Sequence, residues 1–159
     1  MSGIGPYSIP AAANSSSGVT SQDRASQLDK MFGKDIWFDL RKASGANYEV
    51  TPAGDWKTVQ GAEALRQAII RRIMTDPGEW AALPDYGVGA RMFVKARNTR
   101  ATRDELSERI RGQLIQDPRI ESVETVDVAI TSESLRISVV VQPKGRSLRH
   151  EAVRASVEI

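Results

Sequence analysis

Few side chains in this sequence could carry chemistry, and the first candidates are two carboxylates in one short segment. Glu79 directly precedes Trp80, and Asp85 directly precedes Tyr86. A glycosidase needs two carboxyl groups beside the scissile bond, one of them with a raised pKa, and this pair could take those roles. Such pairs are also common in ordinary loops, where Glu79 would bind a helix end and Asp85 would occupy a turn. We expect the structural role and keep glycoside hydrolysis as the alternative.

Composition excludes most other catalytic and metal sites. The chain has no Cys and a single His, His150. This excludes disulfides, thiol catalysis, thiolate ligands and a His-rich metal site, and it argues against a Ser/His/Asp triad. Gly87-Val88-Gly89 begins like a dinucleotide fingerprint but continues into residues 90–92 without a third glycine. We therefore expect no cofactor and no metal.

A basic run is the third chemical feature of the sequence. It could bind phosphates, but the whole chain has 22 basic and 20 acidic residues, a net charge of only +2. Nucleic-acid-binding domains are usually basic throughout, and no aromatic residue for base stacking follows Phe93 in the run. We predict a surface that docks an acidic protein, and no nucleic acid as partner. The run consists of Arg91, Lys95, Arg97, Arg100, Arg103, Arg109 and Arg111.

Two helices are expected to position these groups. In the first, Ala62 to Thr75, four apolar residues form one stripe at the 3.6-residue period, with Gln67 largely opposite them. Asp76-Pro77-Gly78 ends that helix. The second helix is predicted to begin at a capping box formed by Thr102 and Glu105 and to stop at Asp117-Pro118.

Strands are indicated on both sides of the helices. Residues 35–40 alternate as in a half-buried strand and could pair with a short strand at 55–59. The clearest β signal is a hairpin from Val123 to Gln142, and residues 153–159 could add a third strand or fray. The order of elements predicts an α+β fold, with two main helices packed on a small, mostly antiparallel sheet that ends in a β-hairpin.

The first 30 residues differ from the rest of the chain. They are rich in Ser, Ala and Gly and carry no charged residue before Asp23, so we expect a flexible arm at 1–30 and a single domain at 31–159. Ile4, Tyr7 and Ile9 suggest an arm that orders on a partner. The sequence contains neither a signal peptide nor an apolar run that could span a membrane, which favours a protein made in the cytoplasm with no membrane partner.

Asp117-Pro118-Arg119 marks the junction between the second helix and the hairpin. Proline fixes the direction in which the chain leaves the helix. Arginine offers a rigid fork of five donors that can hold a carboxylate or several backbone carbonyls. An exposed arginine after a helix stop is the simpler interpretation of these three residues alone.

Several segments together resemble the phage baseplate assembly protein W family, the small inner-baseplate proteins that initiate the sheath of contractile tails. Relatives occur in type VI secretion and other contractile injection systems. The family's Glu-Pro-Arg hallmark corresponds to Asp117-Pro118-Arg119, whose shorter acid keeps the charge and reduces the reach. The resemblance covers roughly residues 31 to 142. The other matching segments are Asp35-Ile36, Gly54-Asp55, residues 61–69, residues 72–75, Pro77-Gly78-Glu79 and residues 84–87.

The resemblance implies an assembly role in the baseplate of a contractile tail. The protein would be present in sixfold copies around the tube, in contact with other wedge proteins, the tail sheath protein and possible tube or hub proteins. It would start the sheath by accepting a strand at the edge of its hairpin, and it would act without enzymatic activity. A lysozyme-like peptidoglycan hydrolase using Glu79 and Asp85 is the alternative. The implied assembly residues are Gln67, Thr75, Gly78, Glu79, Tyr86, Gly87, Asp117, Pro118 and Arg119.

Overall fold

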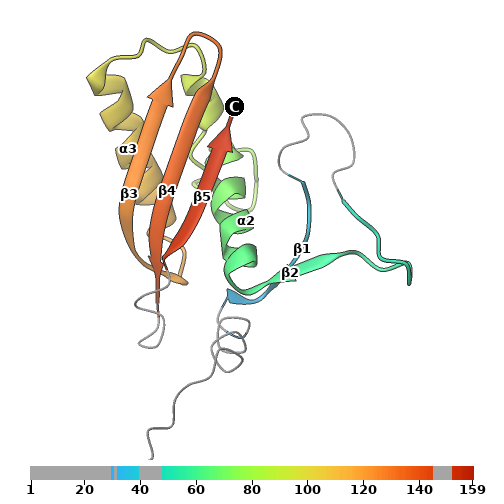
Figure 1. Ribbon diagram of the computed structural model, residues 1–159. Coiled ribbons are helices and arrows are strands. Elements are labelled where there is room, and N and C mark those ends of the chain that lie inside the picture. The colour runs from blue at the N-terminus through green and yellow to red at the C-terminus, as the bar shows by residue number, and fades with distance from the viewer. Residues whose placement is uncertain (1–29, 31, 40–47, 145–151) are drawn as a thin grey trace, which may run out of the picture.

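The computed structural model describes residue 30 and residues 32–39, 48–144 and 152–159. Its main body is a three-stranded antiparallel sheet with two helices on one face (Figure 1). The strands are β3 (Ile120–Ile130), β4 (Leu135–Pro143) and β5 (Val153–Glu158). Strand β4 lies between β3 and β5, so the C-terminal segment forms the third strand. The predicted arm at 1–30 lies outside the described residues except for Lys30.

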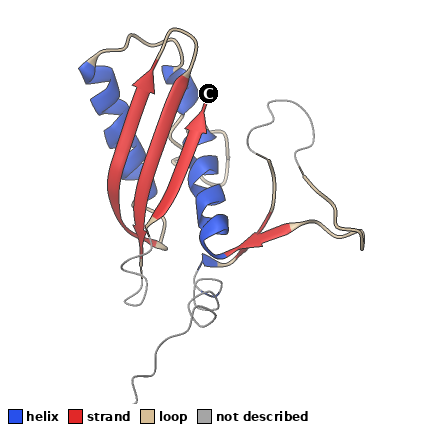
Figure 2. Ribbon diagram, in the orientation of Figure 1, coloured by secondary structure: helices blue, strands red, loops and turns tan. Residues whose placement is uncertain are grey.

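The two helices are α2 (Gly61–Met74) and α3 (Arg100–Leu114). Helix α2 packs beside β5 and α3 beside β3, so both cover the same face of the sheet (Figure 2). The core lies between these layers because each element turns one apolar stripe inward. Its largest fully buried side chains include Leu65, Ile69 and Ile73 of α2, Leu106, Ile110 and Leu114 of α3, and Ile137 and Val139 of β4. These elements confirm the predicted α+β fold.

A separate two-stranded ribbon extends from the body beside α2 (Figure 1). Strand β1 (Lys34–Ile36) pairs antiparallel with β2 (Thr58–Gln60), as the sequence suggested. Both strands are shorter than predicted, and beyond them the ribbon continues only through the single bridges of Phe38 with Tyr48 and Val50 with Trp56. Ile36 is 42% exposed, because the ribbon has no second layer there.

Two local predictions about the helices were wrong. Helix α3 begins at Arg100, and its cap is Thr99, whose hydroxyl accepts the Thr102 backbone N–H at 3.1 Å. The capping box at Thr102 therefore does not form, because Thr102 already lies inside the first turn. Gln67 is 4% exposed instead of facing solvent, since the ribbon covers that side of α2. The short 3-10 helix η1 (Ala90–Phe93) was not predicted.

The pairing of β5 with β4 determines which backbone groups of β5 point outward. Leu135 and Ile159 exchange both backbone hydrogen bonds at 2.9 Å. Because such pairs alternate in an antiparallel ladder, the N–H and C=O groups of Arg154, Ser156 and Glu158 point away from β4. Arg66 of α2 occupies one of them, since its Nε donates to the Arg154 carbonyl at 2.8 Å. None of the described strands pairs with this edge.

Candidate functional site

Three consecutive residues just after α3, Asp117, Pro118 and Arg119, form a compact polar clamp. The Arg119 guanidinium binds the Asp117 carboxylate through two bonds, Nε to Oδ1 at 2.8 Å and Nη2 to Oδ2 at 2.7 Å. The Arg119 backbone N–H also donates to Asp117 Oδ1, at 3.0 Å. Pro118, which is exposed, turns the chain so that the two side chains meet. The shorter Asp therefore reaches the arginine without difficulty.

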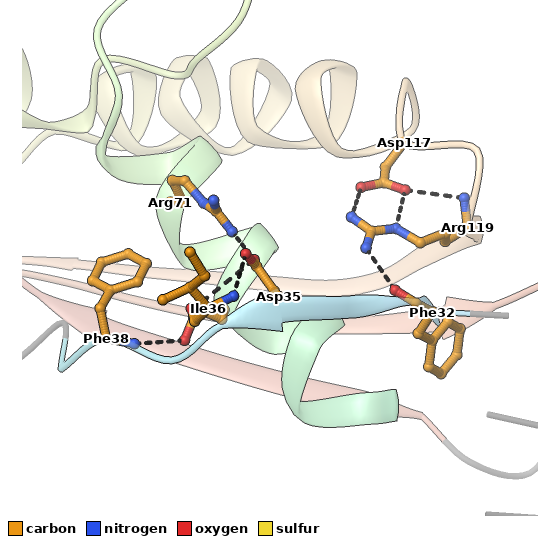
Figure 3. Close-up of polar contacts among 8 residues, drawn as sticks. Phe32, Asp35, Ile36, Phe38, Arg71, Asp117 and Arg119 are labelled. Atoms are coloured by element: carbon orange, nitrogen blue, oxygen red, sulfur yellow. Dashed lines mark hydrogen bonds and ion pairs between the residues drawn. The ribbon is translucent and has the colours of Figure 1, made fainter. Parts of the chain in front are cut away.

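This clamp also holds a distant part of the chain. Arg119 Nη1 donates to the Phe32 carbonyl at 3.1 Å, as Figure 3 shows. Phe32 is buried in the core at 2% exposure and directly precedes the ribbon. The Asp117 side chain is 9% exposed and that of Arg119 is 27% exposed. Arg119 is thus paired and partly buried, so the simpler interpretation of an exposed arginine after a helix stop is wrong.

Electrostatics favour the ionised form of both partners. Burial by itself raises the pKa of Asp117, but the hydrogen bonds from Arg119 and the positive charges of Arg119 and Arg72 outweigh it, so that pKa lies below its usual value. The hydrogen bond to Asp117 raises the pKa of Arg119, against the opposing effect of burial. The clamp is therefore a charged pair at neutral pH.

Gln67 fixes the ribbon to α2. Its Oε1 accepts the Phe38 N–H at 3.2 Å and its Nε2 donates to the Ile36 carbonyl at 2.7 Å. One turn later, Arg71 forms an ion pair with Asp35 on the same side of the helix (Figure 3). A buried amide costs free energy unless both of its ends are satisfied; here β1 satisfies the Nε2 end, and Phe38, just beyond β1, satisfies the Oε1 end. Gln67 and Arg71 together position the start of the ribbon.

The loop after α2 folds back tightly on the end of that helix. The Gly89 N–H donates to the Thr75 carbonyl at 2.9 Å and the Val88 N–H to the Arg72 carbonyl at 3.0 Å. Gly87 has φ of +110°, and a Cβ there would lie 2.4 Å from the Thr75 carbonyl oxygen. Only glycine allows this approach.

Two aromatic rings and an arginine stack on the outside of that loop. The Trp80 and Tyr86 ring centroids lie 5.5 Å apart with an interplanar angle of 18°. The Arg72 guanidinium lies 4.5 Å from the Tyr86 centroid, a cation–π contact. Trp80 remains 46% exposed, so the stack presents an aromatic surface to solvent.

These elements converge on one hollow of about 270 Å³, which we call the Arg119 hollow. Of the predicted residues it brings together Asp117, Arg119 and Tyr86. Gln67, Thr75 and Gly87 are buried and do not line it, whereas Gly78, Glu79 and Pro118 are exposed. The sequence reasoning assigned no site role to the residues that complete the lining, which are Phe32, Lys34, Asp35, Ala68, Arg71, Arg72 and Trp80. For Arg71 a signal existed, since it follows Gln67 at helical spacing.

Of the two residues considered for hydrolysis, Glu79 contributes to the local structure through its carboxylate and Asp85 through its backbone. Glu79 accepts the Asp76 N–H through Oε2 at 3.0 Å and so closes the turn after α2. The backbone carbonyl of Asp85 accepts Gln113 Nε2 at 2.8 Å. Both residues are exposed, and neither lines the Arg119 hollow. Among the described residues no cluster of His, Asp or Glu could hold a metal ion, and no helix has the length and apolar character to cross a membrane.

A family model described as the contractile injection system sheath initiator matches residues 34–144. The match spans more than half of the chain, from β1 through the clamp to the end of β4. The chain belongs to the sheath initiator family. This confirms the resemblance on which the assembly residues were predicted.

Two solved structures share the fold of this sheath initiator. One is a chain of the anti-feeding prophage baseplate, determined by cryo-EM with sixfold symmetry; it is 22% identical, with a TM-score of 0.53, covering 72% of this chain and 88% of that one. The other is a candidate tail lysozyme from Geobacter sulfurreducens, also 22% identical, with a TM-score of 0.51, covering 61% of this chain and 87% of that one. No curated protein sequence matches the chain.

Proposed function

We propose that this sheath initiator is a non-enzymatic part of the inner baseplate, which joins wedge subunits around the tube and starts the sheath by accepting a strand at a sheet edge. Its partners are wedge proteins and the sheath protein, it is present in sixfold copies, and it resides in the particle after assembly in the host cytoplasm. The family match and the fold shared with a baseplate chain support this role. We also propose that residues 31–159 form a single domain and that residues 1–30 form its arm.

The observation that carries the proposal is the open edge of β5. It borders a groove of about 770 Å³ between the sheet, α2 and the ribbon, lined among others by Trp37, Phe38, Ser156 and Glu158. The outward backbone groups of β5 could pair with an added strand, and Trp37 and Phe38 would contact its side chains. The groove therefore suits an extended polypeptide.

The β3 edge of the hairpin is less suited to this role. Its register shifts twice, between Ile120 and Ser122 and between Val123 and Thr125. Glu121, Glu124 and Asp127 are all exposed along the strand. Irregular register and charge are devices that keep edge strands from pairing. We therefore place the incoming strand at β5.

Ser156→Pro tests this placement because proline removes an outward N–H and leaves the pairing of β5 with β4 intact. We expect the chain to fold, judged by circular dichroism, and particles with sheaths to disappear from negative-stain images of cells that make the whole particle. Ser156→Ala, which keeps the N–H, should assemble normally. The corresponding variant of β3 is Val128→Pro, which removes an outward N–H of that strand, with Val128→Ala as its control. If Ser156→Pro and Val128→Ala assemble and Val128→Pro does not, the incoming strand pairs with β3 instead.

Glu79→Gln separates the assembly role from hydrolysis. The amide keeps an oxygen that can accept the Asp76 N–H but cannot act as a general acid. We therefore expect normal particle yield, and no peptidoglycan release from the wild-type chain or from the variant in a dye-release assay. Release by the wild type that is lost in Glu79→Gln would establish the hydrolase and overturn the non-enzymatic assignment.

A further inference from the structure

The basic run identified in the sequence separates into two parts in the folded chain. Three of its arginines brace the fold. Arg109 lies over the Phe93 ring, 5.3 Å from its centroid. Arg111 Nη1 donates to the Val123 carbonyl at 2.8 Å, and Arg103 Nη1 donates to Asn98 Oδ1 at 2.7 Å.

The other four cations are exposed at one end of the molecule. Arg91 lies in η1, Lys95 and Arg97 in the connection to α3, and Arg100 at the start of α3. Within the described part of the chain only Arg100 among them forms an ion pair, with Asp104 at 3.5 Å, and these side chains are 90% and 69% exposed. A pair so exposed contributes little. We call Arg91, Met92, Lys95, Arg97 and Arg100 the basic end.

Two features of the basic end are unfavourable in the isolated chain. Arg100 places a cation at the positive end of the α3 dipole, and the first turn of α3 has no acidic residue to compensate. Lys95 has φ of +68°, a left-handed conformation that costs a non-glycine residue about 1 kcal/mol. A negative charge on a partner would offset the repulsion between Arg100 and the dipole. Met92, 61% exposed beside Arg91, adds an apolar contact.

We propose that the basic end docks a carboxylate-rich surface of another protein in the particle. A protein fits better than nucleic acid, because Asp104, Glu105 and Glu108 are exposed on α3 directly after the basic end and would repel a phosphate backbone. Phe93, the ring nearest these cations in sequence, is buried under Arg109 and offers no stacking surface. None of the residues of the basic end lines the β5 groove, and α3, which begins at Arg100, packs beside β3 at the opposite edge of the sheet from β5 (Figure 1). This site is therefore independent of strand addition.

The test is the triple variant Arg91→Glu, Arg97→Glu and Arg100→Glu. An acid at position 100 favours the α3 dipole, so the variant should unfold at a temperature no lower than the wild type. We expect particle yield to fall about tenfold or more, because like charges placed opposite each other cost several kcal/mol. The matched control replaces the same three residues by Lys and should assemble within about twofold of wild type.

Selection for restored yield then identifies the partner. Suppressors of the triple Glu variant are expected as acidic-to-basic changes clustered in one other particle protein, which would support the proposal. Normal yield from the triple Glu variant would overturn it. So would tight binding of a short DNA duplex by the wild type at physiological salt, measured by fluorescence anisotropy and lost in the variant. The Ser156→Pro result is unaffected by any of these outcomes.

Discussion

Gly87→Ala is expected to lower the free energy of unfolding by about 3 to 5 kcal/mol. The new Cβ would lie 2.4 Å from the Thr75 carbonyl oxygen and 2.9 Å from its carbon. Both atoms are backbone and cannot rotate away. Moving them would break the bond from the Gly89 N–H to the same carbonyl, which joins the loop to α2. Urea denaturation followed by circular dichroism measures the loss.

Two other glycines separate the causes of that loss. Gly78 has φ of +82° with open space around its Cβ position, so Gly78→Ala should cost only the left-handed conformation, about 1 kcal/mol. Gly112 lies in α3 with no atom within 4 Å, and Gly112→Ala should stabilise by about 0.5 to 1 kcal/mol. A loss for Gly87→Ala no greater than for Gly78→Ala would mean that the close approach to Thr75 is not rigid.

The parts of the site that periodicity could predict are those whose burial is decided within one element. The apolar stripe of α2 and the hairpin follow from spacing alone. Gln67 does not, because its burial depends on β1, which reaches it from 31 residues earlier in the chain and accepts its Nε2 at the Ile36 carbonyl. Helix α3 begins earlier in the chain than predicted for a local reason. Thr99 and Thr102 are both suitable N-cap residues, and the helix is capped by the first of them.

Arg119 shows the same limit for a motif. Three adjacent residues contain the whole ion pair, so its formation could be expected from the sequence once the family resemblance was seen. The bond from Arg119 to the Phe32 carbonyl spans 87 positions and has no local signal. Through this long-range contact, the turn after α3 also holds the start of the ribbon.

Arg119→Ala is expected to reduce assembly more than it reduces folding. Removing the guanidinium leaves the buried Asp117 carboxylate with only the backbone N–H of residue 119 from the clamp, and it frees the Phe32 carbonyl. Breaking a buried pair costs about 3 to 5 kcal/mol, and the partial exposure of Arg119 lowers our expectation to about 2 to 3 kcal/mol. The isolated chain should still fold, while cells making the whole particle should yield few sheathed particles.

Two controls distinguish loss of the site from loss of stability. Arg119→Lys keeps the charge but cannot form the two-bond fork, so it should give an intermediate loss of particles. Ile110→Ala removes core packing away from the Arg119 hollow at a similar cost of about 2 to 5 kcal/mol. Equal particle yields from Ile110→Ala and Arg119→Ala, at equal free energies of unfolding, would show that the clamp serves folding alone.

The pH dependence of the Arg119→Ala effect identifies the ion pair as its cause. Because the native pKa of Asp117 is lowered, the contribution of the pair is fully present above the unfolded pKa, near about 4 for an Asp. It is lost as the pH falls from the unfolded to the native pKa, because in that range the unfolded chain binds a proton at Asp117 that the native chain does not. The difference in unfolding free energy between wild type and Arg119→Ala should therefore be constant from neutral pH down to about 5 and narrow below about 4. A difference that stays the same in acid would assign the loss to the Phe32 carbonyl and to packing, and not to the Asp117 charge.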